Sequence, residues 1–264
     1  MFWRAPTAVV VVLGLSALTV SAALAQRPLS IADIQGAGSS TPVEGTSVTV
    51  EGVVTADLRS DGSYGGIYIQ SAQETTVEGA SDGIFVEVSE SPDSLATSDL
   101  VTVTGVAAEV DGETQIVDAV AKVLNTGVEL PAAAQLPDGT DPADLESFEG
   151  MLVEPVGSYT LESTSDLDTD GSLQIADAAG TTFTLDDGLS TPIVGERPFF
   201  AADATPATGS SFTAPTNAMV LGETAGGYRL EPSHPVVGAA DTAFAPSFSA
   251  GGFVLGDAPT LDAP

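Results

Sequence analysis

Short runs of β-branched and aromatic residues, separated by glycine, Asp-Gly and proline, dominate the chain from residue 45 onward. The clearest runs cover residues 47–54, 66–70, 83–88, 100–106 and 114–117. Such runs, bounded by turn-forming residues, are typical of β-strands. Helical patterns are confined to two short stretches, residues 31–34 and 142–148. The sequence therefore predicts an all-β protein.

The five strands expected within residues 45–125 predict one small closed unit. A five-stranded barrel protects the strand edges that a small open sheet would expose. Gly52 and Gly105 lie inside strand patterns, where glycine marks a bulge or a sharp bend. We therefore predict an OB-like barrel module over residues 28–126.

The pattern begins again after residues 127–146, a stretch rich in Pro, Ala and Asp that is predicted to be a linker. Glu149-Gly150 precedes apolar residues as Glu51-Gly52 does, and Asp170-Gly171-Ser172 matches Asp61-Gly62-Ser63. This internal similarity predicts a second OB-like module over residues 147–236. Chance similarity between glycine-rich β sequences is the alternative. Residues 237–264, rich in Ala, Pro and Gly, are predicted to be a flexible tail.

The N-terminal residues have the features of a secretory signal peptide. Arg4 is followed by an uncharged stretch over residues 8–23 and by Ala23-Leu24-Ala25, a small-residue cleavage site. We therefore predict that residues 1–25 are removed and that the protein is secreted to the extracellular space, without stable membrane insertion. An uncleaved membrane anchor is the alternative.

The charge of the chain is extreme, with 37 Asp and Glu residues, 6 Lys and Arg residues and a formal net charge of −31. Proteins that grip nucleic acid phosphates or anionic lipids normally carry basic clusters. Solubility in salty surroundings is the simplest explanation of the acidity. The absence of Cys excludes thiolate chemistry, and a single His means that a metal site would consist mainly of oxygen ligands.

Several segments resemble one family when they are taken in order. Ile-Ala-Asp-Ile-Gln-Gly at residues 31–36, Val-Thr-Val-Glu-Gly-Val-Val at 48–54 and Gly-Ile-Tyr-Ile-Gln at 66–70 come first. Residues 81–86, 101–105, 148–153 and 228–232 continue the series. Together they resemble the non-catalytic N-terminal region of secreted ExeM/NucH-type endonucleases.

In that family the region implies an OB-fold module ahead of an endonuclease/exonuclease/phosphatase domain. The motifs of that catalytic domain do not occur here, since Gly256-Asp257 is followed by Ala-Pro and His234 lies in Ser-His-Pro. The resemblance therefore implies an accessory module or a truncated relative that is not an enzyme by itself. Its implied partners are DNA or a nuclease catalytic domain.

OB-folds bind nucleic acid strands on one barrel face, by stacking bases on aromatic rings and holding phosphates with basic residues. In the first module, the candidates for this face are Arg59, Tyr64, Tyr68, Gln70 and Phe85. The alternation of strand side chains places Tyr68 and Gln70 on one face and Ile67 and Ile69 on the other. The alternative is that Tyr68 and Phe85 are core residues, and the negative charge also weighs against phosphate binding.

The segment from Asp166 to Asp177 has the spacing of a calcium loop. The candidate ligands are Asp166, Asp168, Asp170, Ser172 and Asp177, with Gly171 at the sixth position. Alternate carboxylates on a tight loop can converge on Ca²⁺. However, the last position is Asp instead of Glu, and the flanks have strand patterns instead of helical ones. A solvated turn at Asp170-Gly171 is the alternative.

These observations predict a secreted, non-catalytic accessory or binding module that engages nucleic acid. The alternative is a structural or interaction protein of the cell envelope that is stiffened by Ca²⁺. A stand-alone hydrolase is poorly supported, because the sequence has no nucleophile elbow: the one Gly-x-Ser-x-Gly match, at residues 79–83, is followed by a strand pattern and not by a helix.

Overall fold

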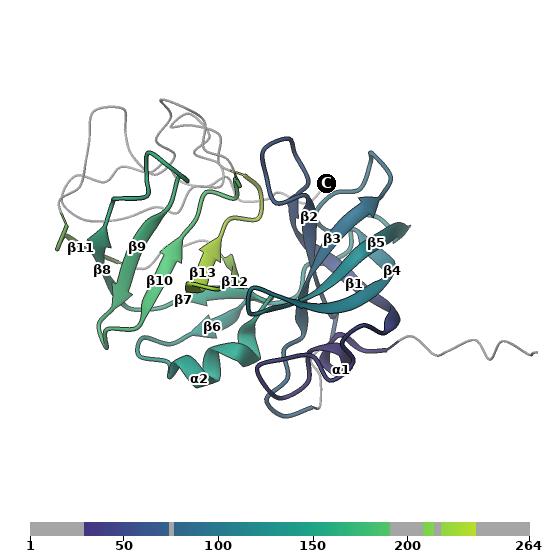
Figure 1. Ribbon diagram of the computed structural model, residues 1–264, viewed down its shortest axis with the longest axis horizontal. Helices are drawn as coiled ribbons and strands as arrows, with labels where there is room; N and C mark the ends of the chain where they lie inside the picture. The colour runs from purple at the N-terminus through teal and green to yellow at the C-terminus, as the bar shows by residue number, and fades with distance from the viewer. Residues whose placement is uncertain (1–28, 74–76, 191–207, 214–217, 236–264) are drawn as a thin grey trace, which may run out of the picture.

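The computed structural model describes residues 29–73, 77–190, 208–213 and 218–235 (Figure 1). The predicted signal peptide, residues 1–25, and the predicted tail, residues 237–264, lie outside these ranges. The described part is nearly all β, which confirms the predicted class. None of its helices has the length and apolar character needed to cross a membrane.

The first sheet is a closed barrel with the strand order β1-β2-β3-β5-β4. Its strands are β1 (Ser47–Leu58), β2 (Gly66–Gln70), β3 (Gly83–Glu90), β4 (Leu100–Val110) and β5 (Glu113–Asn125). Strands β3 and β5 pair in parallel and the other pairs are antiparallel. The predicted five-stranded, OB-like barrel is therefore confirmed. The pairing of β4 with β5 shifts register at Gly105, where the sequence predicts a bulge.

A short helix, α1 (Ile31–Gln35), closes one end of the barrel core. Its first turn is fixed by a capping box, in which the Ser30 side chain accepts a hydrogen bond from the Asp33 backbone and the Asp33 side chain accepts one from the Ser30 backbone. Ile31 and Ile34 are fully buried in the barrel core. The helix thereby fixes the position of Gln35, whose side chain donates hydrogen bonds to the Gly83 carbonyl and to Glu149, in the segment before the second sheet's Leu152–Pro155 strand.

The second sheet is open and has eight strands in the order β11-β8-β9-β10-β13-β12-β7-β6. Its strands are β6 (Ala134–Leu136), β7 (Leu152–Pro155), β8 (Ser158–Ser163), β9 (Leu173–Asp177), β10 (Thr182–Leu185), β11 (Ser211–Thr213), β12 (Met219–Thr224) and β13 (Gly227–Glu231). It curls into a half-barrel, consistent with the predicted OB-like architecture.

Part of the predicted linker belongs to the second sheet. Residues 127–146 contain β6, which pairs in parallel with β7, and α2 (Pro142–Leu145), which runs into a 3-10 turn, η1 (Glu146–Phe148). Leu136 and Leu145 are buried in the core of this sheet. Two isolated leucines among Pro, Ala and Asp give too weak a periodicity to predict this packing.

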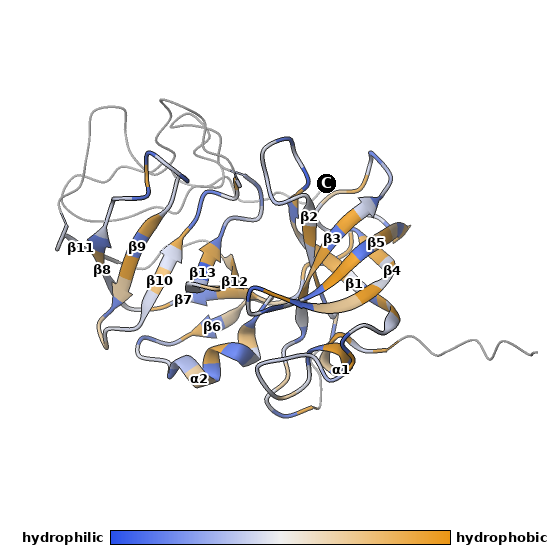
Figure 2. Ribbon diagram, viewed as in Figure 1, coloured by the Kyte–Doolittle hydropathy of each residue, from blue (hydrophilic) through white to orange (hydrophobic). Residues whose placement is uncertain are grey.

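Each sheet has its own hydrophobic core, and a third cluster joins them. Orange, hydrophobic stretches lie on the strands of both sheets in Figure 2. The joining cluster consists of Ala56, Leu58, Tyr68, Phe85, Leu152 and Val220. Because its members come from β1, β2 and β3 on one side and from β7 and β12 on the other, the barrel and the second sheet share a packed interface, here called the junction.

Candidate functional site

The junction is held together by specific contacts as well as by apolar packing. The Tyr68 and Phe85 rings meet edge to face, with centroids 4.9 Å apart. The side-chain oxygen of Gln70 accepts a hydrogen bond of 2.9 Å from the Leu152 backbone in the second sheet. The face of β2 and β3 that lies outside the barrel core is therefore a contact face for the second sheet.

This arrangement decides between the two interpretations of the predicted base-binding residues. The alternation in β2 is as expected, since Ile67 and Ile69 lie in the barrel core while Tyr68 points to the other side. That other side is covered, and Tyr68, Gln70 and Phe85 are only 0%, 4% and 4% exposed. They are core residues. The prediction of a base-stacking face is therefore corrected, because the second sheet covers that face.

The Arg59 side chain is bonded to residues of the barrel unit. Its guanidinium forms an ion pair of 2.7 Å with Asp57 and donates hydrogen bonds to the Ser91 side chain and the Leu95 carbonyl. The hydrogen bond and the charge of Asp57 raise the pKa of Arg59. A guanidinium engaged in this way fixes the end of β1 instead of standing ready for a phosphate.

A buried polar network crosses the junction. The Tyr68 hydroxyl donates to Glu113 at 2.7 Å and contacts Glu231 at 3.4 Å. Arg229 forms an ion pair with Glu231 and lies 3.9 Å from Glu113. Its guanidinium also stacks over the Tyr64 ring, 4.3 Å from the ring centre. Tyr64 in turn donates a hydrogen bond of 2.9 Å to Asp186.

Burial shapes the charges of this network. It raises the pKa of Glu231 to about 8, against the opposing effect of the Arg229 charge. Burial lowers the pKa of Arg229, but Glu231, Tyr68 and Glu113 together raise it well above the ordinary value. Arg229 therefore stays charged, and its positive charge partly offsets the effect of burial on the acidic groups around it.

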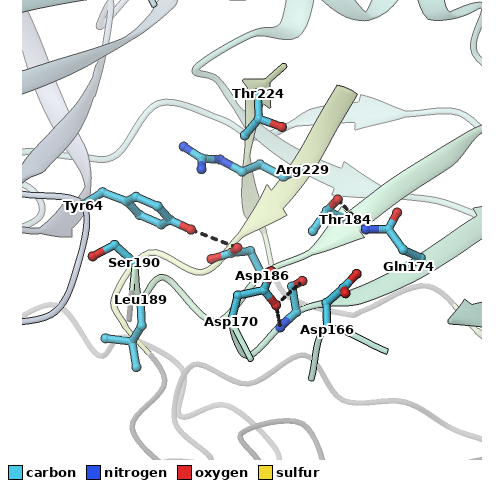
Figure 3. Close-up of a pocket in the computed structure, with 11 residues that line it drawn as sticks. Tyr64, Asp166, Asp170, Gln174, Thr184, Asp186, Leu189, Ser190, Thr224 and Arg229 are labelled. Atoms are coloured by element: carbon cyan, nitrogen blue, oxygen red, sulfur yellow. Dashed lines mark hydrogen bonds between the residues drawn. The ribbon is translucent and has the colours of Figure 1, made fainter. Parts of the chain in front are cut away.

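Two pockets open at the junction, and we call them the junction pockets. One has a volume of about 290 Å³ and is lined on its acidic side by Asp166, Asp170 and Asp186 (Figure 3). The other has a volume of about 340 Å³, and its acidic lining residues are Glu87, Asp111, Glu113 and Glu223. Tyr64, Thr224 and Arg229 line both pockets. Of the predicted ligand-binding residues, Tyr64 lines both pockets and Phe85 lines the second one.

The predicted calcium residues are only partly brought together. Asp166, Asp170 and Ser172 line the first junction pocket, and Asp170 accepts hydrogen bonds from the Ser172 backbone and hydroxyl. Asp168 is exposed in the same loop and does not line the pocket. These contacts match the alternative of a turn at Asp170-Gly171, where Gly171 has a φ of 78°.

Asp177 lies at the opposite end of β9, so the last predicted ligand is separated from the first by a whole strand. Its carboxylate accepts hydrogen bonds from the backbone of Gly139, Ala179 and Thr181. A calcium loop must fold back on itself to bring its twelfth position to the ion. Here the residues after Ser172 extend as a strand, and the predicted five-residue set is corrected accordingly.

Three glutamates form a cluster that the sequence does not single out. One carboxylate oxygen each from Glu146, Glu149 and Glu223 lies within 4.8 Å of the others. Two buried glutamates, Glu149 of this cluster and Glu231 of the network around Arg229, lie in segments that resemble ExeM/NucH-type endonucleases. That resemblance is the only signal in the sequence that points to them. Among 37 acidic residues, nothing local marks the buried ones.

Comparisons with known proteins add little. No protein-family model matches the chain, and no curated protein matches it. Among solved structures, a murine DNA-binding protein bound to double-stranded DNA aligns with 81% of this chain and 99% of its own chain, at 12% identity and a TM-score of 0.32. So distant a likeness bears no argument about function. The similarity to ExeM/NucH-type endonucleases stays a prediction.

Proposed function

We propose that this protein is a non-catalytic binding module whose junction pockets take a positively charged ligand, namely a basic segment of a partner protein. The observation that supports this most is the state of Arg229. Among the residues that the structure describes, it is the one basic residue lining either junction pocket, and it is already paired with Glu231 and stacked on Tyr64. The other charged residues in these linings are all carboxylates.

The carboxylates are concentrated in the linings of the two junction pockets, which strengthens their attraction for a cationic ligand. Asp166, Asp170 and Asp186 face one pocket, and four further acidic residues face the other. Clefts lined by charges of one sign focus the field and raise the local concentration of ions of opposite sign. Hydroxyl and amide groups of Gln174, Thr184 and Ser190 add hydrogen-bonding partners for a Lys or Arg side chain.

Nucleic acid is less well supported as the ligand. Single-stranded nucleic acid is held by accessible aromatic rings together with a basic groove. In this structure Tyr68 and Phe85 are buried, and Arg59 is paired with Asp57. The resemblance to secreted nucleases supports a different partner, a catalytic domain whose DNA-facing surface must be basic. An acidic module and a basic surface attract each other over long distances.

The experiment compares a labelled oligo-lysine peptide with labelled single-stranded DNA, by fluorescence anisotropy with the purified chain at low and high salt. We expect the peptide to bind, more weakly at high salt. The double variant Asp166→Asn, Asp170→Asn should weaken binding, because it removes two charges from one pocket. Asp168→Asn, a matched change in the same loop but outside the pocket, should not. DNA binding without peptide binding would overturn the proposal.

A further inference from the structure

Glu149 is a buried carboxylate with only one of its two oxygens satisfied. The residue is 0% exposed. Its Oε1 accepts hydrogen bonds of 3.1 Å from the Gln35 side chain and from the Thr114 backbone. Its Oε2 is buried and accepts no hydrogen bond from the described part of the chain. A buried charged group without full compensation is costly, so Oε2 calls for a positive partner.

Two further acidic side chains lie close to the Glu149 carboxylate. Glu146 at the start of η1 and Glu223 on β12 each place a carboxylate oxygen within 4.8 Å of the other members of the cluster. The charges acting on Glu223 are those of Glu146, Glu113 and Glu109, which are all carboxylates. Proximity of this kind is unfavourable unless a cation or a shared proton lies between the groups.

The cluster is reachable from solvent. A cavity of about 570 Å³ is lined by Glu146, Glu223 and Tyr228, together with Ser39 and Asp144. Tyr228 donates a hydrogen bond of 3.0 Å to Glu146 Oε2, which leaves Oε1 of that residue for another partner. The cavity offers both an entry path and room for water molecules that complete a coordination shell.

We propose that Glu146, Glu149 and Glu223 bind a divalent cation, with Ca²⁺ preferred over Mg²⁺. Ca²⁺ takes oxygen ligands at about 2.3–2.6 Å in a flexible shell, and oxygens up to 4.8 Å apart can lie on opposite sides of such an ion. Mg²⁺ demands a tighter octahedron, about 2.0–2.1 Å from metal to oxygen, and retains more of its water. The site is distinct from the Asp166–Asp177 segment and goes beyond the proposed ligand of the junction pockets.

The location gives the cation a structural consequence. Glu149 is bonded to Gln35 of α1 and to Thr114 of β5, both of which belong to the barrel unit. Glu223 belongs to the second sheet. A cation held by both carboxylates therefore ties the second sheet to the barrel, and its removal loosens the junction.

The test measures Ca²⁺ binding by isothermal titration calorimetry and thermal unfolding, after treatment of the purified chain with a chelator. We expect one Ca²⁺ per chain, a higher Tm with Ca²⁺, and a smaller shift with Mg²⁺. Glu149→Gln and Glu223→Gln should each weaken affinity about ten-fold or more. Glu162→Gln, an exposed glutamate of β8 in the same sheet, serves as the control and should bind Ca²⁺ normally.

The Glu149→Gln variant should fold, because the oxygen of the new amide can still accept the bonds from Gln35 and Thr114. Its Tm without Ca²⁺ should equal or exceed that of the wild type. Three results would overturn the proposal. One is the absence of Ca²⁺ binding by the wild type. Another is a Tm shift that NaCl of matched ionic strength reproduces. The third is a Ca²⁺ response that survives Glu149→Gln but is lost in Asp166→Asn, Asp170→Asn.

Discussion

The guanidinium of Arg229 on β13 lies 4.3 Å from the centre of the Tyr64 ring, which belongs to the turn before β2. This contact joins the second sheet to the barrel. Arg229 also forms an ion pair with Glu231 and lies 3.9 Å from Glu113, and the side chains of both glutamates are almost fully buried. One positive charge thus faces two buried carboxyl groups at the junction.

Replacement of Arg229 should therefore destabilise the protein strongly. Arg229→Met removes the counter-ion and leaves Glu231 and Glu113 buried, a change that typically costs about 3–5 kcal/mol. The free energy of unfolding, measured by urea denaturation, checks this. Lys122→Met, at an exposed position of β5, should change it by no more than about 0.5 kcal/mol. A loss below about 1 kcal/mol for Arg229→Met would show that the network is not formed.

Tyr68 should matter for stability and not for ligand binding. Its hydroxyl donates to Glu113 at 2.7 Å inside the junction. Tyr68→Phe keeps the ring and deletes this donor, so the free energy of unfolding should fall by about 1–3 kcal/mol. Anisotropy titrations with peptide and with single-stranded DNA should be unchanged. A variant of normal stability that loses affinity for DNA would instead place Tyr68 on an accessible binding face.

The close approach of the barrel to the second sheet can be tested at Gly83, the first residue of β3. A Cβ at this position would overlap the backbone carbonyl of Gly150, which leads into β7. Gly83→Ala should therefore force the two units apart and cost about 1–3 kcal/mol or more. Gly38→Ala, where a Cβ meets nothing within 4 Å, is the matched control. Equal Tm values for the two variants would contradict the packing described here.

Stability should decrease as the pH rises through neutrality. Burial and the neighbouring Asp186 raise the pKa of Asp187 from 3.8 to about 7. The folded protein therefore keeps a proton that the unfolded chain has released. This contribution to stability is complete below about pH 4 and is lost as the pH rises through about 7, with a slope of at most about 1.4 kcal/mol per pH unit.

The variant Asp187→Asn isolates this contribution. Its side-chain oxygen can still accept the hydrogen bond that the Leu189 backbone donates to Asp187, while the titration is gone. Urea denaturation at several pH values between about 4 and 8 should give a flatter profile than the wild type. Some slope should persist, because the pKa values of Glu223 and Glu231 are also raised, to about 7 and about 8. Identical slopes in both proteins would contradict the assignment.

The strands of the barrel were predictable because their signals are local. Alternation within Gly66–Gln70 places Ile67 and Ile69 inside, and glycine within a strand pattern marks the bulge at Gly105. The parallel pairing of β10 with β13 and of β6 with β7 is not local. Short strands joined across long segments leave no periodic trace that connects the partners.

The candidate site was predictable only in part, for a related reason. Tyr64, Asp166, Asp170 and Ser172 were chosen for two separate sites, and the fold brings them to one pocket. The coverage of Tyr68 by the second sheet, and the burial of Glu149 and Glu231, depend on how two units dock. Hydropathy patterns within one strand report which faces are apolar, but not what packs against them.

The most direct test of the central claim is a comparison of two affinities under the same low-salt conditions, one for an oligo-lysine peptide and one for single-stranded DNA. Because carboxylates line both junction pockets and Arg229 is internally paired, we predict that the peptide binds more tightly. This preference should shrink in the variant Asp166→Asn, Asp170→Asn. Tighter binding of DNA than of the peptide, unaffected by these substitutions, would contradict the proposed function.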